Sequence, residues 1–116
     1  MAEEYVKQGN YNQAYLLLKD TEKNAANLSE RTYFLLSFVE IKKNMLPEAK
    51  THLEKAIQLD PELDEAYFNL ALINLEQNDL KQAKLNAEKA ANLEPKKEQY
   101  KDLLNEINQQ LQSTKE

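Results

Sequence analysis

Two stretches of this sequence carry the same pattern of residues at a fixed offset. Residues 30–63 and residues 64–97 align without a gap, so that equivalent positions lie 34 residues apart. The positions that match are Tyr33 and Tyr67, Phe34 and Phe68, Leu36 and Leu70, Ala49 and Ala83, Ala56 and Ala90, and Pro61 and Pro95. A constant period of this length is typical of a solenoid, in which each repeat buries its apolar face against its neighbours.

Within each repeat, the pattern predicts a hairpin of two helices. Residues 30–43 carry apolar side chains at helical spacing, and Asn44 stands where this first helix must end. Asn tolerates the left-handed backbone conformation of a helix C-cap, which also accounts for Asn78 at the equivalent position. Pro47 suits the first turn of the second helix, and Asp79 is placed as the N-cap of its counterpart in the next repeat.

This pattern resembles the tetratricopeptide repeat, a helix hairpin with an aromatic residue, a leucine, small residues and a proline at set positions. The matching residues are Tyr33, Leu36, Ser37, Ala49, Leu53, Ala56 and Pro61 in one copy, and Tyr67, Leu70, Ala71, Ala83, Ala87, Ala90 and Pro95 in the other. The sequence departs from the family pattern at Asn44 and Asn78, where Gly is usual, and at Glu40 and Asn74, where an aromatic residue is common. The resemblance implies an all-α fold, a right-handed superhelical solenoid of antiparallel helix hairpins.

The repeat register predicts one domain over residues 1–112. A partial match places Ala14 in the position of Ala49, with a connection one residue longer, and leaves only Ala2–Gln8 for the first helix of that repeat. The expected parts are a truncated first repeat (1–29), a second repeat (30–63), a third repeat (64–97), a capping helix (98–112) and a frayed tail (113–116). The apolar stripe of the capping helix consists of Tyr100, Leu103, Leu104, Ile107 and Leu111.

Composition and charge exclude several classes of function. The chain has 116 residues, a net charge of −5 and no cysteine. A negative chain without a basic run is a poor nucleic-acid binder, and the absence of cysteine excludes disulfides and thiolate metal sites. No apolar run is long enough to insert into a membrane. The N-terminus lacks the form of a signal peptide, so we expect a soluble protein and favour the cytoplasm.

The sequence assembles no catalytic site, and we expect neither enzymatic activity nor a cofactor. A chain with one glycine cannot form a glycine-rich phosphate loop. The single histidine, His52, has no evident partner in the sequence, so we expect it to have only a surface or packing role. The acidic run at residues 60–65 lacks the glycine and the final acidic ligand of a calcium loop, so we interpret it as an inter-repeat turn and expect no metal site.

The family resemblance implies a concave groove lined by the first helix of each repeat. From the positions that would face it we predict a partner-binding site made of Arg31, Phe34, Leu35, Phe38, Glu65, Phe68, Asn69, Leu72 and Glu76. Leu35, Phe38 and Leu72 are apolar where the family is usually polar. We therefore expect an occupant there, which is a partner segment, a further part of the solenoid or a second copy of the chain.

A second set of residues defines a known binding mode of the family, the carboxylate clamp for acidic chaperone C-termini. The clamp needs lysine and arginine on the first helices, whereas Glu65 and Asn69 occupy the positions expected to be basic. Only Asn69 matches a clamp residue type. Without a cation the bound carboxylate has no charge-assisted hydrogen bonds, so we expect no clamp.

These observations predict a non-enzymatic interaction module, an adaptor or scaffold that binds a partner peptide or helix in a partly apolar groove. An alternative is self-assembly into a homo-oligomer through the N-terminal edge, whose exposed apolar candidates are Tyr5, Val6, Tyr11, Tyr15 and Leu16. A third hypothesis is that the chain is a regulatory fragment of a larger protein.

Overall fold

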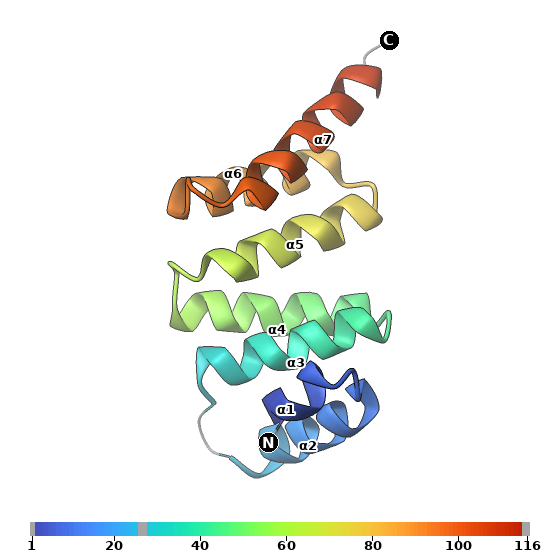
Figure 1. Ribbon diagram of the computed structural model, residues 1–116, viewed down its shortest axis with the longest axis vertical. Helices are drawn as coiled ribbons and strands as arrows, with labels where there is room; N and C mark the ends of the chain where they lie inside the picture. Colours follow the sequence, from blue (N-terminus) through green and yellow to red (C-terminus); the bar gives the residue numbers. More distant parts are fainter. Residues whose placement is uncertain (1, 26–27, 115–116) are drawn as a thin grey trace. The chain divides into compact units, whose positions relative to one another are not determined.

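The computed structural model describes residues 2–25 and 28–114, and seven α-helices lie within these ranges (Figure 1). They are α1 (Ala2–Lys7), α2 (Tyr11–Asn24), α3 (Glu30–Lys42), α4 (Leu46–Leu59), α5 (Asp64–Glu76), α6 (Leu80–Leu93) and α7 (Glu98–Thr114). The described residues contain no strand, which confirms the predicted all-α class. The chain divides into two compact units, Met1–Pro61 with α1 to α4 and Glu62–Glu116 with α5 to α7.

The first unit is built from two helix hairpins, α1–α2 and α3–α4. Ala14 and Leu18 of α2 form a buried cluster with Leu36 and Val39 of α3. Side chains that are partly buried against this cluster are Ala2, Tyr5, Val6, Tyr11, Tyr15 and Leu35. Within α3–α4 the fully buried residues of the second helix are Ala49, Leu53 and Ala56. Since alanine occupies little volume, the two helices of the hairpin can approach closely.

The second unit is the α5–α6 hairpin with α7 packed against it. Its buried cluster consists of Ala71, Ala83, Ala87, Leu103 and Ile107, with Phe68, Leu75, Leu104 and Leu111 partly buried against it. The buried Tyr100 of α7 donates its hydroxyl to Asp64 at the start of α5, and Lys97 forms an ion pair with the same carboxylate at 3.1 Å. Burial and the bond to Asp64 raise the pKa of Tyr100 to about 12.

All three hairpin turns use the same left-handed C-cap. Gly9, Asn44 and Asn78 have φ angles of 77°, 60° and 60°. At Asn44 the amide of Met45 donates to the carbonyl of Glu40 (2.7 Å), while the amide of Asn44 donates to that of Ile41 (3.0 Å). This is the Schellman pattern, in which the turn satisfies two carbonyls that the helix leaves free. The predicted roles of Asn44 and Asn78 are therefore confirmed.

Two helices have N-terminal caps made by side chains, and one of these is the predicted cap Asp79. Ser29 accepts a hydrogen bond from the amide of Thr32 at 3.1 Å, and Asp79 accepts one from the amide of Gln82 at 3.3 Å. Pro47 lies in the first turn of α4, where the lack of an amide hydrogen costs nothing.

The C-terminal boundary differs from the prediction. The predicted capping helix ends at residue 112, but α7 continues to Thr114, so the predicted frayed tail 113–116 does not begin at Ser113. No glycine or proline stands in this stretch to end the helix. Residues 115 and 116 of that tail, and residues 1, 26 and 27 of the predicted first repeat, lie outside the described residues. The limits of the individual repeats stay predictions.

The left-handed turn at Asn78 can be tested by substitution. We expect Asn78→Val to lower the free energy of unfolding by about 1–2 kcal/mol, because a branched side chain is disfavoured at positive φ. Asn78→Gly should preserve stability, since glycine adopts this conformation freely. Urea unfolding followed by circular dichroism measures both. The control is Gln77→Val, one residue earlier at φ −87°; equal losses in the two valine variants would contradict the assignment.

Candidate functional site

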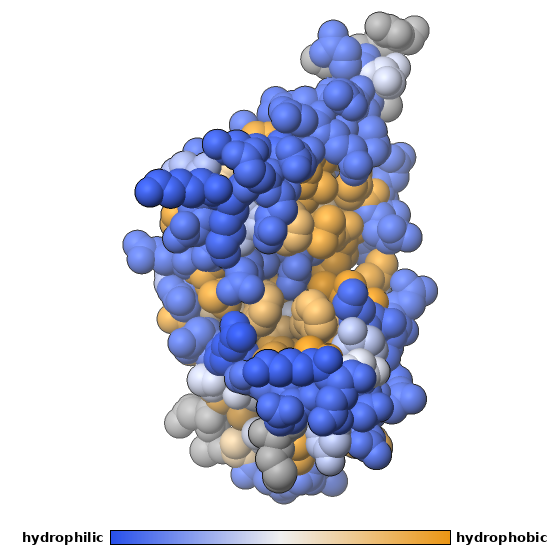
Figure 2. Space-filling view, in the orientation of Figure 1, coloured by the Kyte–Doolittle hydropathy of each residue, from blue (hydrophilic) through white to orange (hydrophobic). Residues whose placement is uncertain are grey.

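The face of α5 carries Phe68 and Leu72 of the predicted binding site, together with Leu75. The spacing of four and three residues places these side chains on one side of the helix. Phe68 and Leu75 are partly buried against the core of the second unit, whereas Leu72 is 37% exposed. Figure 2 shows hydrophobic side chains gathered where α5 and α7 lie, between hydrophilic ones. Leu72 is thus an accessible apolar side chain between two fixed ones.

Phe68 is held in place by the start of α7. Its ring lies 4.9 Å from the ring of Tyr100 between centroids, in a tilted arrangement that aromatic pairs favour. Tyr100 is fixed in turn by its hydrogen bond to Asp64. Burial of the carboxyl raises the pKa of Asp64, but the hydrogen bonds from Tyr100 and Lys97 outweigh it and lower the pKa below its usual value. The base of the α5 face is therefore rigid.

The polar residues predicted on α5 differ in accessibility. Glu76 is exposed and Glu65 is half-buried, so both can meet a partner. Asn69 is buried and has little surface to offer. The accessible part of this face is therefore an apolar side chain with a carboxylate toward each end of the helix.

The equivalent face of α3 in the first unit is largely engaged in packing. Phe34 is buried, with the guanidinium of Arg31 5.5 Å from its ring centroid. Leu35 packs against the buried cluster of the first unit and lines a pocket of about 540 Å³. Phe38 is half-buried, and its ring meets that of Tyr11 edge-on at 6.4 Å. Arg31 itself is exposed, with a carboxylate oxygen of Glu3 3.9 Å away.

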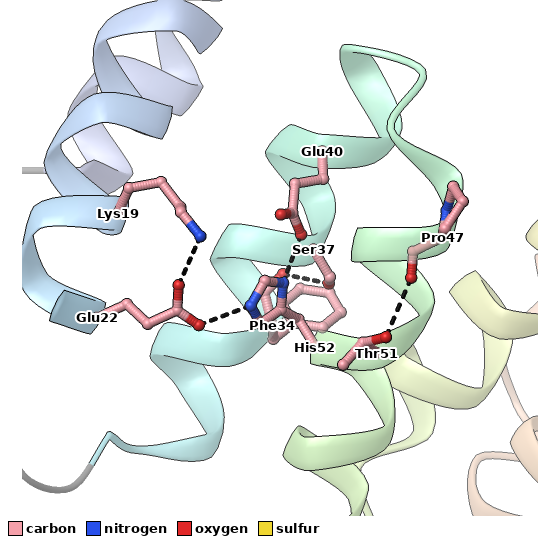
Figure 3. Close-up of polar contacts among 8 residues, drawn as sticks. All are labelled: Lys19, Glu22, Phe34, Ser37, Glu40, Pro47, Thr51 and His52. Atoms are coloured by element: carbon pink, nitrogen blue, oxygen red, sulfur yellow. Dashed lines mark hydrogen bonds and ion pairs between the residues drawn. The ribbon is translucent and has the colours of Figure 1, made fainter.

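His52 packs inside the first unit and has polar partners that were not predicted from the sequence. It was expected to lack partners, but it is only 6% exposed and its two ring nitrogens lie 2.7 Å from carboxylate oxygens of Glu40 and Glu22 (Figure 3). The equivalent position in the next repeat is Asn86, whose amide donates to Asn74 at 2.7 Å. Glu40 and Asn74, the partners on the first helix of each hairpin, occupy the position where an aromatic residue is common in the family. A polar residue at this position in both repeats, matched by a polar residue twelve positions later, was the available signal.

The described part of the chain contains neither a candidate metal cluster nor a candidate membrane-spanning helix. No group of three or more His, Cys, Asp or Glu side chains is arranged there to hold a metal ion. None of the helices there is long and apolar enough to cross a lipid bilayer.

Two family models match the chain. One is described as a TPR repeat and matches residues 39–78, and the other as a tetratricopeptide repeat and matches residues 64–97. Together they span residues 39–97, half of the sequence, and the second match has the same bounds as the predicted third repeat. The chain belongs to the tetratricopeptide repeat family. No curated protein matches it in sequence.

Several solved structures share the fold of this chain, and two of them are described as tetratricopeptide repeat (TPR) domains. The first TPR domain of Spaghetti (RPAP3), bound to an HSP90 peptide, has a TM-score of 0.85 and 21% identity, over 95% of this chain and 86% of that one. The second TPR domain of human RPAP3, in complex with an HSP70 peptide, has a TM-score of 0.80 and 21% identity, over 92% and 88% of the two chains. MamA has a TM-score of 0.87 and 20% identity, over 93% of this chain and 63% of that one.

Substitution of Phe68 should lower the free energy of unfolding more than substitution of Leu72. We expect Phe68→Ala to lower the free energy of unfolding by about 2–3 kcal/mol, somewhat less than for a fully buried phenylalanine. Leu72→Ala should cost about 1 kcal/mol or less, because much of its side chain is already in water. Urea unfolding of both variants measures the difference. A loss at Leu72 as large as that at Phe68 would mean that Leu72 belongs to the core.

Proposed function

We propose that this protein is a non-enzymatic adaptor that binds a segment of a partner protein on the first-helix faces of its repeats. The observation that carries the proposal is Leu72, an apolar side chain that remains exposed at a position where the family is usually polar. The face of α5 in the second unit is the main binding surface. Arg31 and Phe38 belong to the equivalent face of α3 in the first unit, which is a candidate surface of its own.

The α5 face suits a partner with an apolar side chain that is inserted beside Leu72. Burial of exposed apolar surface contributes roughly 25 cal/mol for each Å² removed from water. Because Phe68 is already fixed by Tyr100 and the helix core, binding does not have to order it. The carboxylates of Glu65 and Glu76 favour basic residues on either side of the apolar one. An amphipathic helix or an extended segment with this pattern fits the face.

An acidic chaperone tail does not fit this surface. Two structural relatives are bound to HSP90 and HSP70 peptides that end in Glu-Glu-Val-Asp. In this chain Glu65 and Asn69 stand where a clamp requires cations, and the net charge of the chain is −5. An acidic peptide would meet carboxylates instead of the charge-assisted donors that it needs.

This mismatch predicts that the peptide SRMEEVD, which the first of these relatives binds, fails to bind here. In a fluorescence-anisotropy titration with labelled peptide we expect no saturation up to about 1 mM, a limit that corresponds to a binding free energy weaker than about −4 kcal/mol. The control is the same titration with a domain that has the clamp. Saturable binding in the micromolar range would contradict the proposed partner chemistry.

The role of Leu72 is tested by affinity capture from native lysate with the wild-type chain and Leu72→Glu as baits. We expect proteins captured by the wild type to be lost with Leu72→Glu, since a charge there must be desolvated against the partner's apolar side chain. The matched control is Leu85→Glu, a leucine that is 60% exposed on α6, and its captured set should equal that of the wild type. Circular dichroism verifies that both variants are folded. Identical sets from all three baits would refute binding at α5.

The alternative of self-assembly rests on α2. Of its predicted edge residues, Tyr5, Val6, Tyr11 and Tyr15 are partly buried within the first unit, whereas Leu16 is 68% exposed. One exposed leucine is a small contact for a stable interface. Sedimentation of the wild-type bait over a range of concentrations separates the two functions, because an adaptor stays monomeric and a self-assembling chain gains mass.

A further inference from the structure

Three helices of the first unit meet at one buried imidazole. His52 of α4 places Nδ1 2.7 Å from an oxygen of Glu40 on α3 and Nε2 2.7 Å from an oxygen of Glu22 on α2 (Figure 3). The other oxygen of Glu22 accepts from Lys19, also on α2, at 2.8 Å. Glu40 has no exposed surface. The imidazole is therefore a direct polar link between α2 and the α3–α4 hairpin.

The number of protons in this cluster determines whether the link holds. A carboxylate only accepts hydrogen bonds, and a neutral imidazole has one N–H group. Two contacts of 2.7 Å to two carboxylates require two N–H donors, which only the imidazolium provides. When His52 loses a proton, the lone pair of one ring nitrogen faces a carboxylate oxygen and that contact becomes repulsive.

Charge balance leads to the same conclusion. With His52 protonated, the cluster holds two cations, Lys19 and His52, and two anions, Glu22 and Glu40. Glu40 depends on His52, because its second oxygen, Oε2, is buried without a hydrogen-bond partner in the described part of the structure. Loss of the histidine proton therefore leaves a buried carboxylate without a countercharge, a costly arrangement in a protein interior.

We propose that His52 is a proton-dependent latch that strengthens the packing of α2 on the α3–α4 hairpin while it is protonated and weakens this packing at higher pH. The latch is independent of the binding surface on α5. The titratable and charged groups that face it are Lys19 and Glu22 from α2, Tyr33 and Glu40 from α3, and Lys55 from α4. Tyr33 stacks on the imidazole at 6.0 Å between centroids, and the ammonium of Lys55 lies 5.7 Å from the tyrosine ring.

The pKa shifts set the direction of the pH dependence. Burial lowers the pKa of His52, but the hydrogen bonds to Glu40 and Glu22 outweigh it and raise the pKa above its usual 6.5. A raised histidine pKa stabilises the folded state fully below pH 6.5, and this contribution is lost as the pH rises through the folded-state value. For Glu22, burial is outweighed by the bonds from Lys19 and His52, so that its pKa falls below 4.5. Its contribution is present above pH 4.5 and is lost only in stronger acid.

The second unit provides an internal comparison. Asn74 and Asn86 occupy the positions equivalent to Glu40 and His52 and form a hydrogen bond of the same length, 2.7 Å. Neither asparagine titrates, so the α5–α6 hairpin should not respond to pH through this contact. A pH effect on α2 that spares α5 and α6 therefore identifies the latch rather than a general effect of charge.

The first test is NMR of the full chain, in which His52 is the only histidine and its ring signals are unambiguous. We expect both ring nitrogens to carry protons at pH 6 and His52 to titrate above pH 6.5. Amide hydrogen exchange, corrected for its intrinsic pH dependence, should show α2 losing protection as the pH rises through that midpoint, while α6 keeps it. A neutral ring at pH 6, or loss of protection that is equal in α2 and α6, would overturn the proposal.

Three variants distinguish an effect of the His52 latch from a general loss of stability. His52→Asn reproduces the residue of the second unit and should abolish the pH dependence of protection in α2. Glu22→Gln, at a partly exposed position, keeps an acceptor without the charge. It should lower the His52 midpoint and weaken the protection of α2 at pH 6. The control Glu48→Gln changes an exposed carboxylate on α4 and should leave both readouts unchanged. An unchanged His52 midpoint in Glu22→Gln would also refute the latch.

Discussion

Close contact between the two helices of each hairpin is the constraint on which the remaining structure depends. In α3–α4 the contact surface of the second helix has Ala49 and Ala56, and in α5–α6 it has Ala83 and Ala90, all fully buried. A methyl side chain lets the helices approach closely, and a larger side chain would force them apart at a cost of about 1–3 kcal/mol. Because this contact fixes the rotation of each first helix, it also determines which of its residues remain for other partners.

Much of the fold can be predicted from turn and cap residues that recur with the 34-residue period. Asn44 and Asn78 mark the turns because asparagine tolerates positive φ. Ser29 marks a helix start because its hydroxyl accepts a hydrogen bond from a free backbone amide, and Pro47 marks one because it has no amide hydrogen to leave unpaired. Each signal is weak alone, but its recurrence in register makes it specific. The end of α7 lacks such a signal, which explains why its last residues were placed in a tail.

Only part of the cluster at His52 can be predicted by the same reasoning. Glu40 and His52 belong to one hairpin, and their equivalents Asn74 and Asn86 show that the pair follows the repeat. Glu22 comes from α2, in a hairpin whose connection to the next is one residue longer. Its position depends on the packing of α2 against α3, which local sequence does not determine. The two repeats therefore keep one geometry at this site while one pair carries charge and the other does not.

The same divergence separates the two first-helix faces. Phe38 and Leu72 are equivalent in the repeat, yet Phe38 meets Tyr11 within the first unit and Leu72 remains accessible. A position in the family pattern thus defines where a side chain lies along the hairpin and leaves open whether it is free to bind. Whether such a side chain is accessible to a partner depends on the helix that packs beside it. The ring of Tyr11 from α2 covers part of Phe38, whereas Tyr100 packs on Phe68 and supports the face around Leu72. The proposed recognition of a partner is therefore a property of the individual repeats, and the shared fold supplies only the frame that presents them.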